Sequence, residues 1–174
     1  RNSASAITFV ASISSSVTKG RDVVVAKSEE GVVFMWDLRA VHSPTCRPFA
    51  ICEGCPNDSA GSNVAFSPDA SLICVPTISL KGSTASSRLR FFNTDSYKDR
   101  AEPLESCLEI DIDGDFRATR VIWQKHTNQI LVAMSSGTTK VFFDPDMSTK
   151  GVMLSVKKAP PRKKDPMDFV QHIG

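Results

Sequence analysis

The stretch Arg120–Asp146, RVIWQKHTNQILVAMSSGTTKVFFDPD, contains three short runs of aliphatic, β-branched and aromatic residues separated by polar turns. Each run has the length of a strand, and the intervening Asn, Ser, Gly and Thr residues are typical of antiparallel hairpins. The same order of runs and turns occurs twice more towards the amino end of the chain. The stretch therefore predicts a repeated all-β unit.

The repeat is visible in the spacing of aromatic residues. Phe9, Phe66 and Trp123 each close a first strand, at intervals of 57 residues (66 − 9 and 123 − 66). Trp36 and Phe92 close a third strand in the first two units, and Phe143 is expected to do so in the last unit. The second strands are expected at 22–28, 71–77 and 129–136, and a weaker fourth set in PFAICE, CLEIDI and VMLSVKK.

Three units of four strands, each a little over 50 residues long, are the sequence form of β-propeller blades. We expect a partial propeller over residues 1–157, with blades at about 1–57, 58–114 and 115–157, and a tail over 158–174. Because blades bury their faces against neighbours, three alone would leave two apolar flanks exposed. We therefore expect the blades to belong to a larger propeller, of seven blades. An ordinary β-sandwich is the alternative.

The units resemble WD repeats, with the Trp36-Asp37 pair ending a strand. They are more closely similar to the gastrulation-defective type of WD-repeat family, in VAFSPDASLICVPTISLKG, in RLRFFNTDSYKD and in the run Phe142–Pro145. The Gly-His pair that often opens a WD repeat is missing. The resemblance implies a nuclear scaffold linked to RNA processing (spliceosome association) and to chromatin and DNA-damage responses.

The string Trp36-Asp37-Leu38-Arg39 matches a W-D-x-R box. WD proteins that serve as substrate receptors of cullin-4 ubiquitin ligases resemble one another here, so the resemblance implies partner contact through Trp36, Asp37 and Arg39. The planar guanidinium of Arg39 could reach carboxylates or carbonyls of a ligase adaptor. The alternative is a strand end with a solvated arginine.

The basic charge of the chain is concentrated in the tail. The formal net charge is +2, and one cluster within eight residues contributes +5, so the remainder sums to 2 − 5 = −3. This cluster consists of Lys157, Lys158, Arg162, Lys163 and Lys164. Such runs indicate nuclear import or contact with RNA phosphates, and a merely solvated tail is the alternative.

Two segments have ion-binding candidates. His42, Cys46, Cys52 and Cys55 could supply four zinc ligands, although cysteines buried as small apolar residues fit the expected strand better. The segment Glu109–Phe116 superficially resembles a calcium loop, but Arg120 stands where a bidentate Glu is needed. We expect a strand with solvent-facing acids there, and no metal or cofactor.

Other function classes find little support. The chain contains no G-x-S-x-G, P-loop or H-E-x-x-H string, so we expect a protein that is not an enzyme, although a site assembled across a propeller channel stays open. No run approaches the roughly 18 apolar residues of a membrane span, and we see no signal peptide. Five cysteines without a dense framework favour the cytosol or nucleus.

Overall fold

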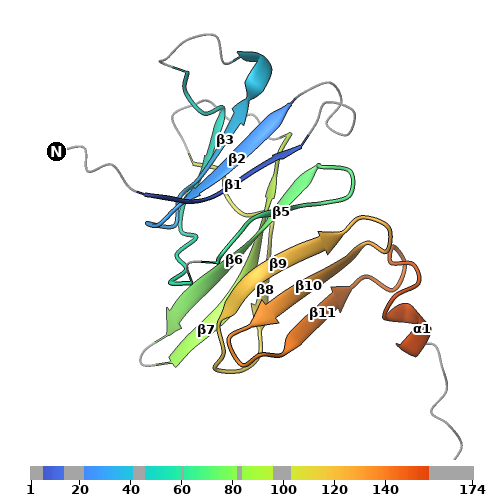
Figure 1. Ribbon diagram of the computed structural model, residues 1–174. Coiled ribbons are helices and arrows are strands. Elements are labelled where there is room, and N and C mark those ends of the chain that lie inside the picture. Colours follow the sequence, from blue (N-terminus) through green and yellow to red (C-terminus); the bar gives the residue numbers. More distant parts are fainter. Residues whose placement is uncertain are drawn as a thin grey trace, which may run out of the picture.

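The computed structural model describes residues 6–13, 22–40, 46–59, 61–81, 84–95 and 103–156. These residues form three antiparallel sheets that follow one another along the chain and pack face to face (Figure 1). In the part of the chain that is described, no helix is long and apolar enough to span a membrane.

The first sheet has the order β1-β2-β3-β4. It consists of β1 (Ile7–Ile13), β2 (Val23–Ser28), β3 (Val33–Asp37) and β4 (Ala50–Cys52), with the short 3₁₀ helix η1 (Leu38–Ala40) after β3. Each strand pairs with the next along the chain, as in a meander. This local pairing is the arrangement that the repeated strand–turn pattern predicts.

The second sheet repeats this order as β5-β6-β7-β8. Its strands are β5 (Ala65–Phe66), β6 (Leu72–Lys81), β7 (Thr84–Asn93) and β8 (Leu108–Ile112). The β6–β7 pairing is long, running from Leu72↔Asn93 to Lys81↔Thr84, so both strands extend beyond the predicted segments 71–77 and 89–95.

The third sheet has three strands among the described residues, in the order β11-β10-β9. They are β9 (Ala118–Gln124), β10 (Gln129–Met134) and β11 (Thr139–Phe143). The prediction of a fourth strand in VMLSVKK is wrong for its described part, because Met153–Val156 form the short helix α1.

The side chain of Gln129 explains this difference. Its amide nitrogen donates to the Lys150 carbonyl at 3.0 Å, and its amide oxygen accepts from the Val152 amide at 3.3 Å. Gly151 between them has a left-handed φ of 52°, and a Cβ there would collide with the Gln129 amide. The chain is thus held in a turn at the end of the sheet instead of running along β11.

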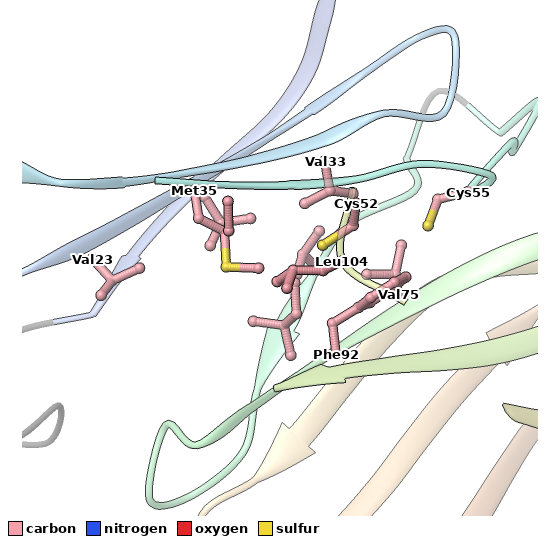
Figure 2. Close-up of a cluster of buried hydrophobic side chains, with 12 residues drawn as sticks. Val23, Val33, Met35, Cys52, Cys55, Val75, Phe92 and Leu104 are labelled. Atoms are coloured by element: carbon pink, nitrogen blue, oxygen red, sulfur yellow. The ribbon is translucent and has the colours of Figure 1, made fainter. Parts of the chain in front are cut away.

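The second sheet is buried on both faces. In β6, Ile73 and Val75 face the first sheet and Cys74 faces the third; all three are fully buried. In β7, Phe92 faces the first sheet and Phe91 the third. This alternation is the side-chain period of a strand, and it creates one apolar layer on each side of the second sheet. Figure 2 shows the layer shared with the first sheet.

The structure corrects the equivalence predicted for Phe9. Phe66 and Trp123 each pack against the sheet that precedes their own. Phe9 instead packs towards the second sheet, which follows its own. The pairing of β1 with β2 has a register shift between Ile7 and Phe9, and a one-residue slip moves a side chain to the opposite face.

The last unit needs a similar correction. Phe92 pairs with Ile73, and the matching partner of Ile130 is Phe142, not Phe143. Phe142 packs against the second sheet, as Phe92 packs against the first. Phe142 is therefore the structural equivalent of Phe92, and Phe143 belongs to the other face.

The outward face of the third sheet carries apolar residues that the described chain leaves uncovered. Ile122, Leu131 and Val141 form one row across β9, β10 and β11, and Ile122 is 56% and Val141 37% exposed. On the outward face of the first sheet, Val10 is 61% exposed. Exposed apolar side chains at both ends of the stack agree with the expectation that these sheets belong to a longer series.

Candidate functional site

A depression of about 580 Å³ lies at the end of the sheets where β2 turns into β3. We call it the loop pocket. Its lining comes from strands β1 and β6 and from the β2–β3, β4–β5 and β8–β9 connections: Thr8, Glu29, Pro56, Asn57, Asp58, Ser59, Ile78 and Arg117. Pro56 and Ile78 are its apolar part, and the remaining lining is polar or charged.

Asn57 fixes the wall of the loop pocket. Its side-chain amide donates to the Pro76 carbonyl in β6 at 3.2 Å and to the Ala118 carbonyl in β9 at 3.1 Å. Its side-chain oxygen accepts from the Ser59 amide at 3.0 Å, which closes a tight turn. One side chain therefore ties the β4–β5 connection to both the second and the third sheets.

A close backbone contact fixes the opposite wall. The Cys55 amide donates to the Gly31 carbonyl at 2.8 Å, and Gly31 has a φ of 80°. A Cβ at position 31 would lie 2.5 Å from the Pro56 nitrogen, so any larger residue would push the β2–β3 turn away from the connection.

Asp58 and Arg117 form an ion pair across the mouth of the loop pocket. Their side chains are 49% and 50% exposed. Water screens such a pair strongly, so it contributes little to stability, and both charges are accessible to a bound partner. The wall is thus held by partly buried hydrogen bonds, and this ion pair places one charge of each sign at the rim.

Lys27 lies beneath the β4–β5 connection and is 1% exposed. Its ammonium donates to the Ser62 hydroxyl at 2.7 Å and to the Pro76 carbonyl at 3.2 Å. Burial lowers the pKa of Lys27 to about 8, with the nearby Cys55 thiol acting in the opposite direction. Pro76 thus accepts from both Lys27 and Asn57, which couples the buried layer to the pocket wall.

The W-D-x-R box lies at the opposite end of β3 from the β2–β3 turn. Trp36 is half-buried and packs on Phe34 with ring centroids 5.7 Å apart. Arg39 folds back onto Asp37 through two charge-assisted bonds, 3.1 Å from Nε and 2.7 Å from a terminal nitrogen. The Arg39 side chain is 53% exposed. The three predicted residues are therefore neighbours at one rim, with the guanidinium oriented by its own box.

The chain is similar to WD repeat-containing protein 70 from several vertebrates. It is 30% identical to the Bos taurus protein over 137 residues, which are 79% of this chain and 19% of that protein. It is 30% identical to the Homo sapiens protein over 125 residues, 72% of this chain and 18% of that protein. The chain belongs to the WD-repeat proteins.

Further relatives agree with this WD-repeat assignment. The Gastrulation defective protein 1 homolog of Drosophila melanogaster is 27% identical over 147 residues, 84% of this chain and 20% of that protein. The WD-repeat chain thus spans about a fifth of the length of the curated relatives it matches. No protein-family model matches it.

Solved structures show the fold of this WD-repeat chain. The β-propeller domain of Cps50 (Swd1) from Myceliophteria thermophila superimposes with a TM-score of 0.50 at 11% identity, covering 78% of this chain and 40% of that one. The C-terminal WD40 domain of Sif2 gives a TM-score of 0.53 at 16% identity, covering 84% and 34%. The three sheets are therefore blades of a partial β-propeller, which confirms the predicted fold class.

The candidate zinc ligands, which the sequence offered as an alternative, do not converge in the described part of this WD-repeat chain. There, no group of three or more His, Cys, Asp or Glu side chains is placed to hold a metal ion. Cys52 and Cys55 are free and fully buried, and burial raises the pKa of both thiols. A protonated thiol is a poor metal ligand. Cys46 is half-buried, and His42 lies outside the described residues.

The acids of the calcium-like segment are held by arginines. Glu109 pairs with Arg88 and Arg90 at 2.6 and 2.8 Å, and Asp111 pairs with Arg88 at 2.6 Å. A hydrogen bond from Ser106, helped by these arginines, lowers the pKa of Glu109. The segment forms β8, the strand with exposed acids that the sequence predicts.

The basic residues of the tail, namely Lys157, Lys158, Arg162, Lys163 and Lys164, lie outside the described residues. Their predicted contact with RNA or import factors stays a prediction.

Sequence reasoning missed Lys27 and Asn57. Lys27 follows Val23 and Val25 at strand spacing, so the alternation of β2 already placed it on the buried face. For Asn57 the chain offers no comparable signal, because its carbonyl partners at positions 76 and 118 are distant in sequence.

Proposed function

We propose that this WD-repeat chain is part of a non-catalytic scaffold that binds partner proteins within a nuclear assembly. The observation that carries the proposal is the loop pocket. Its wall is fixed by Asn57 across two sheets, while the charges of Asp58 and Arg117 stay accessible at its mouth. A pre-formed, partly apolar depression with a few charged groups is the usual form of a binding site.

The pocket favours a peptide segment over a reactive small molecule. Lys27, the most unusual titratable group nearby, is covered and hydrogen-bonded. Pro56 and Ile78 offer an apolar surface for one side chain, and the rim pair offers contacts for a partner of mixed charge. The nuclear setting, and a role in RNA processing or in chromatin and DNA-damage responses, are supported by the resemblance to the gastrulation-defective type.

Site-specific photo-crosslinking in nuclear extract tests this proposal. A photoreactive residue at Ser59, inside the pocket, is compared with one at Asp115, an exposed position outside the residues that line it. We expect a discrete crosslinked partner at position 59, lost in Asp58→Lys and in Arg117→Glu. Equal crosslinking at both positions, or crosslinks indifferent to the charge reversals, would contradict the proposal.

A second candidate is a substrate receptor of a cullin-4 ubiquitin ligase. The observation that favours it is Arg39, which is half exposed at a rim and oriented by Asp37. Arg39→Ala should reduce recovery of the ligase adaptor, whereas Arg47→Ala, which removes another exposed arginine, should not. Unchanged recovery with Arg39→Ala would exclude this function.

A third candidate is RNA binding through the basic cluster at 157–164. Removing these residues should reduce both RNA affinity and its dependence on salt, because each phosphate contact releases counterions. A salt slope that is the same with and without the cluster would show that the tail makes no phosphate contacts.

A further inference from the structure

A second depression, of about 310 Å³, lies between the second and third sheets beside β8 and β11. We call it the outer groove. It is lined mainly by apolar and aromatic side chains: Leu72, Phe91, Leu108, Ile110, Trp123, Asn128, Ile130, Phe142, Phe143, Asp144 and Met147. Leu108 is 51% and Met147 66% exposed, so this apolar surface is uncovered in the described chain.

The corresponding place between the first and second sheets is filled. Leu104, from the segment that leads into β8, is 7% exposed and belongs to the buried layer there. Figure 2 shows Leu104 among Cys52, Val75 and Phe92. Its amide donates to the Ile51 carbonyl in β4 at 2.7 Å, which anchors the segment along the edge of the first sheet.

The strand registers show that the two places are equivalent. In the first sheet, Met35 pairs with Ala50 of β4; in the second sheet, Phe91 pairs with Leu108 of β8. Two pairs further on, Cys52 of β4, which pairs with Val33, corresponds to Ile110 of β8, which pairs with Leu89. Leu108 and Ile110 therefore occupy the positions that Leu104 helps to cover in the first sheet.

The opposite wall is equivalent too, because Phe142 of the third sheet corresponds to Phe92 of the second. The residues of β4 and β8 at these equivalent positions differ in burial, as expected if β8 lacks a side chain that covers it. Ala50 and Cys52 are 7% and 0% exposed, whereas Leu108 is 51% exposed. The outer groove is thus equivalent, one repeat later, to the place that Leu104 fills between the first and second sheets, and in the described chain no such side chain fills it.

The sequence contains one segment that matches the occupant. Leu104 stands in Pro103-Leu104-Glu105, and the tail contains Pro166-Met167-Asp168. Both segments consist of a proline, a long apolar residue that is not branched at Cβ, and an acidic residue. We propose that Met167 docks into the outer groove as Leu104 docks between the first two sheets, with its amide donating to the Glu109 carbonyl, the counterpart of Ile51.

The tail has the length and the starting point for this contact. Met167 lies 11 residues beyond Val156 (167 − 156), the end of α1, and an extended chain spans about 3.3 Å per residue or roughly 36 Å. Gln129 holds the chain before α1 at the end of β10 that pairs with Phe143, a residue of the groove lining. The tail therefore starts from the same end of the sheet as the groove.

Side-chain chemistry supports methionine as the occupant. A flexible thioether adapts to an irregular cavity and makes favourable contacts with aromatic rings. The groove offers the rings of Trp123 and Phe142 at its inner wall. Docking would also cover Leu108 and Ile110, so apolar surface on both partners would leave water.

NMR of the 174-residue chain labelled at methionine methyl groups tests the proposal. The Met167 signal is assigned by its loss in Met167→Leu. We expect it to be shifted by aromatic ring currents and to show cross-peaks to the ring protons of Phe142 or Trp123. A Met167 methyl signal at the position of a solvated methionine, without such cross-peaks, would overturn the proposal.

Hydrogen exchange supplies an independent readout. Met167→Asp should raise the exchange rates of the β8 amides (Leu108–Ile112) roughly tenfold, because their cover is lost, while Met167→Leu should restore protection. The β2 amides (Val23–Ser28) serve as the internal reference for intact folding. Protection of β8 that is unchanged in Met167→Asp, or that falls on dilution as for a second copy of the chain, would contradict docking of the chain's own tail.

Discussion

The interface between the first and second sheets and the interface between the second and third sheets use equivalent strands but are completed differently. The first has a buried lysine, Lys27, at one end and Leu104 covering the other. The second is joined by side chains that hydrogen-bond to the backbone: the Asn63 amide donates to the Val121 carbonyl and accepts from the Val121 amide. The outer end of this second interface is the open groove. Repetition of a strand pattern thus fixes the apolar middle of each interface, whereas its ends depend on individual residues.

The largest expected difference concerns the two equivalent aromatic residues. Phe92 is fully buried, so Phe92→Ala should destabilise the chain by about 3–5 kcal/mol through lost burial and a cavity. Phe142→Ala should cost about half as much, because the Phe142 side chain borders the groove and is only half-buried. Urea unfolding of both variants measures this, and equal losses would mean that the two interfaces are closed to the same degree.

The next largest effect is expected at Asn63. Its side chain accepts from the Val121 amide at 2.7 Å and donates to the Val121 carbonyl at 2.8 Å. Asn63→Ala would leave both buried backbone groups unpaired, at a cost of about 2–3 kcal/mol. The Val121 amide should also exchange faster with solvent. Asn93→Ala, at the half-buried last residue of β7, is the control, and a similar loss there would weaken the assignment of Asn63 to the interface.

A smaller effect of opposite sign is expected at Lys27. Lys27→Met keeps the length of the side chain and removes a buried charge, so it should stabilise the chain by about 1–3 kcal/mol at pH 7. The pKa of Lys27 is about 8 in the folded chain, whereas that of a solvated lysine is 10.5. Between these values the unfolded chain binds more protons, so this lysine destabilises the fold fully below pH 8 and progressively less up to about pH 10.5.

The difference in unfolding free energy between Lys27→Met and wild type measures this effect together with the coupling of Lys27 to the Cys55 thiol, whose raised pKa Lys27 partly lowers. The buried thiols of Cys52 and Cys74 have raised pKa values, so their contribution to stability falls as the pH rises above the pKa of an exposed thiol. That contribution is common to both proteins and cancels. The advantage of the methionine variant should therefore shrink between about pH 8 and pH 10.5, and a pH-independent difference would refute the lysine assignment.

The smallest stability effect is expected at the rim of the loop pocket. Asp58→Asn removes one partner of the exposed pair with Arg117 and should change stability by less than about 0.5 kcal/mol. Thermal unfolding at low and high salt measures this change. A much larger loss would mean that the pair supports the fold and is not primarily available for partners.

Much of the fold could be predicted from the sequence. The repeated strand segments and their order are those observed, because turn residues and β-branched runs act locally. At Phe9 and at Phe143 the predicted equivalence placed the side chain on the wrong face of its sheet. At Met153–Val156 the sequence predicted a strand where the chain forms a helix. The register shift in β1 accounts for the error at Phe9 and the Gln129 side chain for the error at Met153–Val156, and neither leaves a mark in the periodicity.

Less of the candidate site could be predicted. The W-D-x-R box was visible as a string, and the structure adds that Arg39 is oriented by Asp37. The loop pocket was not visible, since Glu29, Asp58 and Arg117 are ordinary surface residues until the three sheets stack. The fully buried cysteines favour the expectation of small apolar residues over the zinc alternative.

The sequence by itself determined the all-β character, the repeat and the strands of the first two sheets, because propensity and turn chemistry are properties of neighbouring residues. Only the tertiary structure decided which face of each strand is covered. It buried Lys27 beneath a loop and joined Asn57 to carbonyls 19 and 61 residues away. It also left a groove uncovered between the second and third sheets, whereas Leu104 fills the equivalent place between the first and second sheets. The physical reason is that covering a face requires a partner surface, and stacking sheets brings that surface from a distant part of the chain.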